Sequence, residues 1–345
     1  MNLFFDYLKQ LTRTPSVVGA EHSFFMFIKR ELEDLNIDVE YYDGLLVAKG
    51  SEPKTGYISA HADRHGLICT GHNEFQYAAY IAKNRADLLG NSTSEQVLKN
   101  FSVRFVGKKV QAYEPWSGSY LGLGNITDAF FCQRRNNVLF KVDGLEHLLP
   151  GTPIAFMDKL VYENDLVSAQ IDNTISIATI LYLYSIGYKG TAFFTASEEA
   201  GKSWRFLLDY FRRFDITTNE LLVLDTSPYK NEDDLNHLDI VLRNRDENAY
   251  FRSPLKSKIK KIAIKKRIKY HYKDEYLKNL MRQNNEKTSL GVTELGRIIK
   301  ASKGTIQGTT LQFPTIGYHT IKETTSINAI ESIINILKII YLNNK

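Results

Sequence analysis

Hydrophobic residues recur at helical spacing near the N-terminus, over residues 2–12 and again over about residues 20–35. The second stretch carries Phe24, Phe25, Phe27, Ile28, Leu32 and Leu35. Shorter apolar runs at residues 37–42 and 45–49 flank a turn and predict a hairpin, and residues 57–60 predict a further strand. The pattern therefore predicts two helices followed by three strands.

The pattern changes over residues 71–164, where short alternating runs are separated by turn residues. Strands are expected at residues 102–106, 108–113, 130–131, 138–142 and 153–156, and a helix at residues 78–89. No catalytic set of residue types gathers in this stretch. We therefore expect residues 71–164 to form a small β-rich inserted domain with a structural or oligomerisation role.

Helices and strands alternate after the insert. Helical spacing is found at residues 174–186, 204–214, 292–301 and 327–340, and strand-like runs lie at residues 191–195, 220–225, 237–243 and 309–317. Residues 274–291 are polar and are expected to be rich in loops. The alternation predicts an α/β fold, with a central mixed sheet flanked by helices, built from residues 1–70 and 165–345.

Composition limits the classes of protein to consider. The 345 residues are 43% hydrophobic, which is enough for a large core. No apolar run approaches the roughly 20 residues that span a bilayer, and the N-terminal residues lack the pattern of a signal peptide. The two cysteines, Cys69 and Cys132, form no Cys-x-x-Cys pattern. We expect a cytoplasmic protein with no membrane partner, whose metal ligands would be histidines and carboxylates.

Positive charge is concentrated in one stretch. The formal net charge is +5, and residues 256–269 hold eight Lys or Arg and no acid. A solvated helix face is the favoured interpretation. Nucleic-acid binding is the alternative, but the stretch has no interleaved aromatic residues and no binding motif, so we expect no nucleic-acid partner.

Adjacent carboxylates follow the apolar run at residues 191–195. Glu198 and Glu199 would lie just beyond the carboxyl end of a strand, where ligands bind in open α/β sheets. One glutamate could bind a metal while its neighbour takes a proton from an activated water. An ordinary acidic helix start is the alternative interpretation.

Histidine and aspartate follow other predicted strands. His61 comes directly after residues 57–60, and Asp63 could orient its imidazole or other ligands from behind. A buried structural histidine is the alternative, and His65 and His72 are given that ordinary interpretation.

Three further positions extend the pattern. Asp172 precedes the predicted helix at residues 174–186, as an N-cap or as a bridge between two cations. Asp225 ends one strand, and His319 follows another. His or acid is thus expected repeatedly at the same edge of the sheet.

The order and spacing of these residues resemble the cocatalytic site of the binuclear zinc aminopeptidases, of the glutamyl aminopeptidase and tetrahedral (TET) aminopeptidase type. The resemblance implies that Asp172 bridges two divalent ions and that Glu198 is the general base, with Asp63 acting behind the ligands. The other implied ligands are His61, Glu199, Asp225 and His319. Zinc is the expected metal, and cobalt and manganese accept the same ligand types. The implied substrates are short peptides, and the insert is implied to form a homo-oligomer.

The chain departs from the pattern of this family at three places. Arg64 stands where an acid is usual, Asn173 follows the bridging position in place of a second aspartate, and Gly291-Val-Thr-Glu294 replaces a typical Gly-Gly-Thr-Asp. The last two are expected near the substrate pocket, where they bear on substrate class.

Two other functions remain open at this stage. The first is a related metal-dependent amidohydrolase that removes the acyl group from N-acyl amino acids. The second is a protein without catalytic activity, either a scaffold or a nucleic-acid binder that uses residues 256–269.

Overall fold

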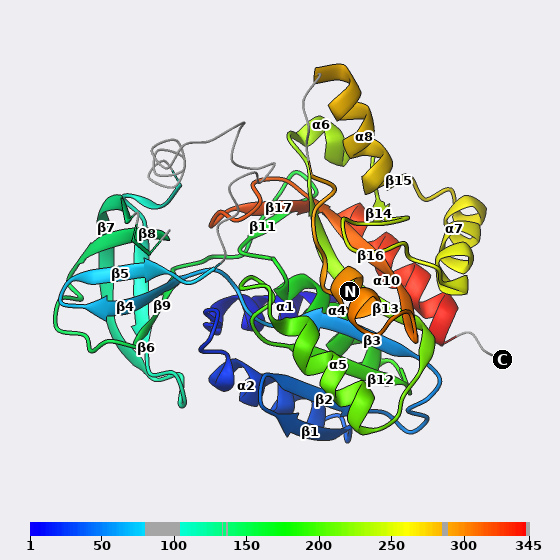
Figure 1. The fold of residues 1–345 in the computed structure, drawn as a ribbon, viewed down its shortest axis with the longest axis horizontal. Coiled ribbons are helices and arrows are strands. Elements are labelled where there is room, and N and C mark those ends of the chain that lie inside the picture. The colour runs from blue at the N-terminus through cyan, green and yellow to red at the C-terminus, as the bar shows by residue number, and fades with distance from the viewer. Residues whose placement is uncertain (80–103, 133, 136, 285–288, 343–345) are drawn as a thin grey trace.

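The computed structural model describes residues 1–79, 104–132, 134–135, 137–284 and 289–342. Figure 1 shows a body of sheet and helices and, on its left, a smaller lobe of strands. This arrangement confirms the predicted α/β fold with a β-rich insert.

An eight-stranded sheet forms the centre of the body, in the order β1-β2-β12-β3-β13-β16-β14-β15. The strands are β1 (Asp38–Tyr42), β2 (Leu45–Lys49), β3 (Tyr57–His61), β12 (Thr191–Thr195), β13 (Thr218–Pro228), β14 (Ile240–Leu242), β15 (Tyr270–Tyr272) and β16 (Ile306–Thr315). The four central strands are parallel, while β2 and β14 join them antiparallel. The sheet is therefore mixed, and the carboxyl ends of its central strands share one edge.

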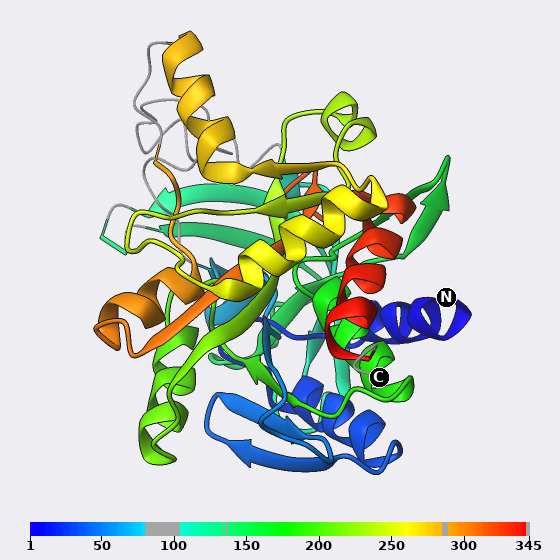
Figure 2. The same ribbon diagram turned by 90° about the vertical axis from the view of Figure 1, so that its right-hand side faces the viewer.

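Helices cover both faces of the sheet. Neighbouring strand residues point to opposite faces, and apolar residues on each face are buried under these helices. Phe194 belongs to a large core cluster that also contains residues of the helices α1 (Asn2–Arg13), α2 (His22–Glu33), α4 (Thr174–Ser185), α7 (Pro254–Lys266) and α10 (Ile327–Tyr341). Phe193 packs on the other face with α5 (Ser203–Arg213) and α9 (Glu294–Ala301). Figure 2 shows α7 in yellow and α10 in red on the side that faces the viewer.

The smaller lobe is a closed barrel with its own core. Its strands are β4 (Leu67–Gly71), β5 (Glu74–Tyr77), β6 (Lys109–Tyr113), β7 (Tyr120–Cys132), β8 (Asn137–Asp143) and β9 (Pro153–Phe156). Phe75, Phe105 and Phe140 are fully buried inside it. A six-stranded barrel thus accounts for most of the described part of residues 71–164.

A separate three-stranded sheet joins two strands that follow the barrel in sequence to one strand near the C-terminus. It consists of β10 (Val161–Glu163), β11 (Leu166–Ala169) and β17 (Glu323–Ser326). The central strand, β11, pairs antiparallel with β17, and this pairing sets Ala169 opposite Glu323. The chain before α4 is thereby held against a segment near the C-terminus.

Most predicted elements end within a few residues of the observed ones, but the prediction of a loop-rich segment at residues 274–291 is wrong for residues 274–284. The structure has α8 (Lys273–Asn284) there instead. Lys273 anchors the start of this helix, since its buried ammonium lies 4.0 Å from the centroid of the Tyr229 ring. Most of the helix predicted at residues 78–89 lies outside the described residues. The strand predicted at residues 102–106 is wrong in its described part, because residues 104–106 form a helical turn instead.

The basic stretch forms a surface helix. In α7 the apolar residues Leu255, Ile259 and Ala263 are buried against the core, so its lysines lie on the remaining face. A short helix, α6 (Glu232–Asn236), completes the elements of this region. Among the described residues, no helix is both long enough and apolar enough to cross a membrane.

Candidate functional site

The candidate ligands lie where the central strands end. His61 is the last residue of β3 and is paired with Thr195, the last residue of β12. On the other side of β3, Val223 is paired with Ser59, so Asp225 reaches the level of His61 two residues later. Parallel strands therefore bring His61 and Asp225 to one edge from adjacent positions in the sheet.

Loops deliver the other ligand candidates to the same edge. Asp172 lies between β11 and α4, and its peptide bond to Asn173 is cis. Glu199 follows β12, and His319 lies between β16 and β17. All three side chains are buried, with exposed fractions of 1%, 7% and 2% for Asp172, Glu199 and His319.

The side chains form two groups that share Asp172. The Nε2 atom of His61 lies 3.3 Å from Asp172 Oδ1 and 3.6 Å from Asp225 Oδ1. The Nε2 atom of His319 lies 2.9 Å from Glu199 Oε1 and 3.7 Å from Asp172 Oδ2. Each imidazole thus faces two carboxylates, and the two oxygens of Asp172 belong to different groups.

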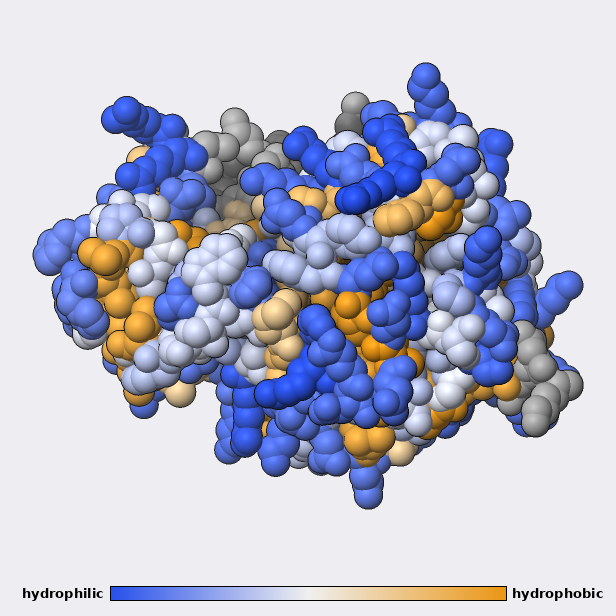
Figure 3. Space-filling model, turned by 90° about the horizontal axis from the view of Figure 1, so that it is seen from below, coloured by the Kyte–Doolittle hydropathy of each residue, from blue (hydrophilic) through white to orange (hydrophobic). Residues whose placement is uncertain are grey.

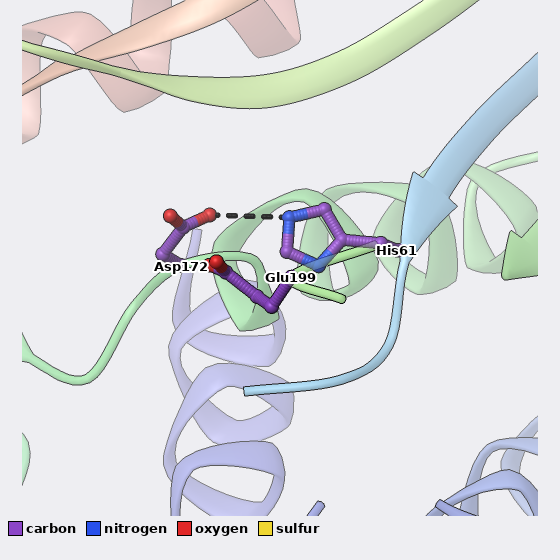
Figure 4. Close-up of side chains that lie close together, drawn as sticks. All are labelled: His61, Asp172 and Glu199. Carbon is purple, nitrogen blue, oxygen red and sulfur yellow. Dashed lines mark ion pairs between the residues drawn. The ribbon is translucent and has the colours of Figure 1, made fainter. Parts of the chain in front are cut away.

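Figure 4 shows three of these side chains converging from different elements. One ligand atom each from His61, Asp172 and Glu199 can be chosen so that the three lie within 4.8 Å of one another. The structure therefore brings together all five residues that the sequence predicted as metal ligands.

Asp63 is placed behind this cluster. Its Oδ1 accepts a hydrogen bond from the backbone N–H of Glu198 at 2.8 Å, and its Oδ2 accepts one from Glu199 at 2.9 Å. The imidazole Nδ1 of His61 contacts the backbone carbonyl of Asp63 at 3.1 Å rather than its carboxylate, which is 3.7 Å away. Asp63 therefore fixes the two glutamates more directly than it fixes the histidine.

Glu21 supports the residue before these glutamates, and sequence reasoning missed it. Its Oε1 accepts hydrogen bonds from the backbone N–H of Ser197 at 3.0 Å and of Gly19 at 2.9 Å. Burial and the neighbouring Asp63 raise the pKa of Glu21 to about 7. Its position at the start of the helix predicted over about residues 20–35 is typical of an ordinary acidic helix start, and no local pattern connects it to Ser197.

Glu323 is a second supporting residue that the sequence did not single out. It is 0% exposed, and its two oxygens accept hydrogen bonds from the backbone N–H groups of His319 and Asp172, both at 2.8 Å. Its spacing of four residues from His319 is visible in the sequence, but the contact with Asp172 depends on the pairing of β11 with β17.

Burial and mutual repulsion shift the titration of the cluster. Burial is the largest cause that raises the pKa of Asp172 to about 6 and that of Asp63 to about 6. Burial also raises the pKa of Glu198 and Glu323 well above the ordinary value, with further contributions from neighbouring carboxylates. Burial lowers the pKa of His61, but the carboxylates around it outweigh this effect and raise it. The site therefore holds more carboxylates than its two imidazoles can neutralise.

The donor set fits divalent metal ions. Each imidazole nitrogen faces two carboxylate oxygens, and a single N–H cannot bond well to both. Apart from its ion pair with His61, the buried Oδ1 of Asp172 accepts no hydrogen bond from the described residues. Imidazole and carboxylate groups together bind zinc and similar divalent ions. A cation in each group could be coordinated by the imidazole nitrogen and by the carboxylate oxygens around it.

Arg64 and Asn173, two of the departures from the family pattern, have structural contacts. The guanidinium of Arg64 donates from Nε to Ser16 Oγ at 2.9 Å and from Nη1 to the carbonyl of Thr12 at 3.1 Å, away from the cluster. The Nδ2 atom of Asn173 donates to the carbonyl of Leu224 at 3.0 Å. Arg64 therefore fastens the N-terminal segment, and Asn173 ties the Asp172 loop to β13.

The third departure also supports the sheet. Glu294 is buried at the start of α9, where it accepts hydrogen bonds from Ser59 Oγ at 2.9 Å and Thr195 Oγ1 at 2.8 Å. These hydroxyls belong to β3 and β12, the strands that lead to His61 and to Glu198. The longer side chain of glutamate thus acts here as a brace beneath the site.

His65 lies closer to the site than its ordinary interpretation suggested. It is buried, and its ring centroid is 5.2 Å from that of His319 and 5.6 Å from that of Phe156 in the barrel. Its Nε2 lies 3.9 Å from Glu323 Oε1. His65 therefore joins the barrel core to the supporting carboxylate of the site.

Comparison with known proteins identifies the fold. No protein-family profile matches the sequence. A TET aminopeptidase from a Thaumarchaeota archaeon of marine sediment is 14% identical, with a TM-score of 0.73 over 100% of this chain and 97% of that chain. The TET1 peptidase of Pyrococcus horikoshii is 20% identical, with a TM-score of 0.66 over 97% and 98% of the two chains. The chain has the fold of the TET aminopeptidases.

The resemblance seen in the sequence is thereby confirmed at the level of the fold. An endoglucanase of Thermotoga maritima shares the same TET fold at 14% identity, with a TM-score of 0.63 over 97% of this chain and 96% of that chain. Proteins with different names thus share the architecture, so function has to be argued from the site.

We predict that Asp172→Ala lowers the zinc content of the protein to at most about half that of the wild type, because the substitution removes a donor from both groups. Metal analysis after dialysis against a zinc buffer measures this. Asp209→Ala, an exposed position on α5, is the matched control and should keep the wild-type content. Equal zinc content in Asp172→Ala and the wild type would contradict the shared-ligand assignment.

Proposed function

We propose that this chain is a metal-dependent aminopeptidase that removes N-terminal residues from short peptides. The observation that carries the proposal is the pair of imidazole and carboxylate groups that share Asp172, with Glu198 held next to Glu199 by Asp63. Proteins named aminopeptidases with the same fold support the reaction class.

Two divalent ions, expected to be zinc, would be held by this site, with cobalt and manganese as alternatives. His61 and Asp225 would hold one ion, His319 and Glu199 the other, and Asp172 both. Bound in this way, the ions would supply Lewis acidity and lower the pKa of a water molecule. The protein's own contribution is to hold these metal ligands in place and to transfer the proton of the attacking water.

Glu198 is suited to be the general base. Its backbone is fixed by Asp63, and unlike Glu199 its side chain is partly exposed. A carboxylate with a raised pKa can take a proton from the attacking water and return it to the departing amine. The water oxygen then bonds to the carbonyl carbon, the C–N bond breaks, and the proton ends on the new amino terminus.

The charge of the site favours a free amino terminus on the substrate. Glu198 and Asp225, the partly exposed members of the cluster, mark its open side. A basic amine is attracted to this surplus of carboxylates, whereas an N-acyl group is neutral. This contrast separates the aminopeptidase from the deacylase that the sequence left open.

We also propose that the protein forms a homo-oligomer through its barrel and works in the cytoplasm. Tyr120, Leu121 and Leu123 on β7 are 61%, 42% and 50% exposed. Figure 3 shows hydrophobic surface on the barrel, at the left of that view. The TET1 peptidase of Pyrococcus horikoshii is described as assembling into a tetrahedron or a large octahedral shell. Exposed apolar strands of this kind commonly mark protein contacts.

Glu198→Gln should lower kcat by at least about a hundredfold and leave zinc content unchanged, because it removes a base without removing a ligand. Peptide hydrolysis and metal analysis on the same preparation measure both quantities. Glu220→Gln, an exposed glutamate on β13, is the control and should retain full activity. Full activity of Glu198→Gln would show that another group is the base.

A peptide series with free and N-acetylated termini tests the substrate class. We expect stepwise loss of N-terminal residues from the free series only, because acetylation removes the basic amine and adds bulk. Product masses followed over time give the result. Equal cleavage of both series, internal cuts or removal of the acetyl group would each refute the aminopeptidase assignment.

Light scattering tests the proposed assembly. At micromolar concentration we expect a mass of at least twice the 39.5 kDa of one chain. Leu123→Glu should lower that mass because it places a charge on the proposed contact, whereas Ile264→Glu on α7, also at an exposed position, should not. A monomeric wild type would show that the barrel has another role.

A further inference from the structure

Glu323 holds two loops that are distant in the sequence. Its Oε1 accepts the backbone N–H of His319, four residues before it, and its Oε2 accepts the backbone N–H of Asp172, 151 residues before it. The carboxylate is fully buried at the start of β17. One side chain thus joins the backbones of two candidate ligands that belong to the same group of the site.

The fold explains how one side chain reaches both loops. Antiparallel pairing of β11 with β17 sets Ala169 opposite Glu323, and Asp172 lies three residues beyond Ala169. His319 lies in the loop that leads into β17 and has a φ of 56°, a left-handed conformation that residues other than glycine rarely adopt. The hydrogen bond from its own N–H to Glu323 holds this turn.

Asp63 makes the matching contact on the other side of the cluster. It accepts the backbone N–H groups of Glu198 and Glu199, the predicted base and a predicted ligand. Two buried carboxylates therefore hold two separate pairs of functional residues, and neither pair shares its support with the other.

We propose that Glu323 is a positioning residue that sets the geometry of Asp172 and His319 in the metal site, independently of the pair Glu198 and Glu199 that Asp63 holds. This inference rests on the proposed function for its catalytic meaning. The side chain suits the role because each of its two oxygens accepts one of the two backbone N–H groups. The substitution Glu323→Gln replaces one of the two acceptor oxygens with an NH₂ donor, so the new side chain can satisfy only one of the two N–H groups.

Amide hydrogen exchange at single-residue resolution on the metal-free protein tests the inference without any catalysis. In the wild type, the amides of Asp172 and His319 should be protected. Glu323→Gln should speed exchange at one or both of them by at least about tenfold and leave Glu198 and Glu199 unchanged. Asp63→Asn should speed exchange at Glu198 and Glu199 and leave Asp172 and His319 unchanged. A general loss of stability would instead speed exchange at all four amides in either variant.

A zinc titration gives the second readout. We expect Glu323→Gln to weaken zinc binding by about ten- to a hundredfold, the usual effect of removing a group that orients metal ligands. Glu331→Gln, an exposed position on α10, is the control and should bind zinc like the wild type.

The outcomes distinguish this inference from the proposed function. Unprotected Asp172 and His319 amides in the folded wild type would overturn the positioning role, as would parallel acceleration of all four amides in Glu323→Gln. If the wild type hydrolyses no peptide, the proposed function fails, and the exchange pattern still decides whether Glu323 holds the two loops.

Discussion

The concentration of negative charge at one buried edge of the sheet is the constraint on which the site depends. Asp63, Asp172, Glu199 and Glu323 are buried there, and the imidazoles close to them are those of His61, His65 and His319. Carboxylates moved out of water are costly unless hydrogen bonds or cations compensate them. Backbone amides supply part of this compensation, since a hydrogen bond to a charged group contributes about 1.5–3 kcal/mol.

The same hydrogen bonds that stabilise the supporting carboxylates also shape the loops. Ser197 and His319 both have left-handed backbone conformations, with φ of 59° and 56°. A left-handed residue other than glycine costs of order 1–3 kcal/mol and persists only where its surroundings hold it. In both cases the strained residue donates its own N–H to a buried glutamate, Glu21 or Glu323. The same hydrogen bond therefore stabilises the buried carboxylate and holds the loop in its left-handed conformation.

Sequence reasoning located the predicted metal ligands and one supporting residue, Asp63, but it missed the supporting residues Glu21 and Glu323, for a physical reason. His61 and Asp225 follow strand-like runs, and parallel strands end at a common edge, so local patterns were enough to place them together. Glu21 and Glu323 act on backbone N–H groups of distant segments, and any buried segment offers such groups. Only the pairing of β11 with β17 shows which amides Glu323 reaches. Likewise, Arg64 was visible as a departure, but its contact with Ser16 requires the folded N-terminal segment.

The fold alone does not decide which reaction the site catalyses, because a protein named endoglucanase also has this architecture. The residue types in the site are more informative. Glycoside hydrolysis ordinarily uses two carboxyl groups roughly 5–9.5 Å apart on either side of a sugar, with no need for imidazoles. Here the imidazoles of His61 and His319 each face two carboxylate oxygens and share Asp172 between them. A pair of carboxyl groups that acts on a sugar would not need the two imidazoles. Two cations would be coordinated by both imidazoles and by the carboxylates around them. The site is therefore better explained by metal-assisted hydrolysis than by acid and base catalysis with two carboxyl groups alone.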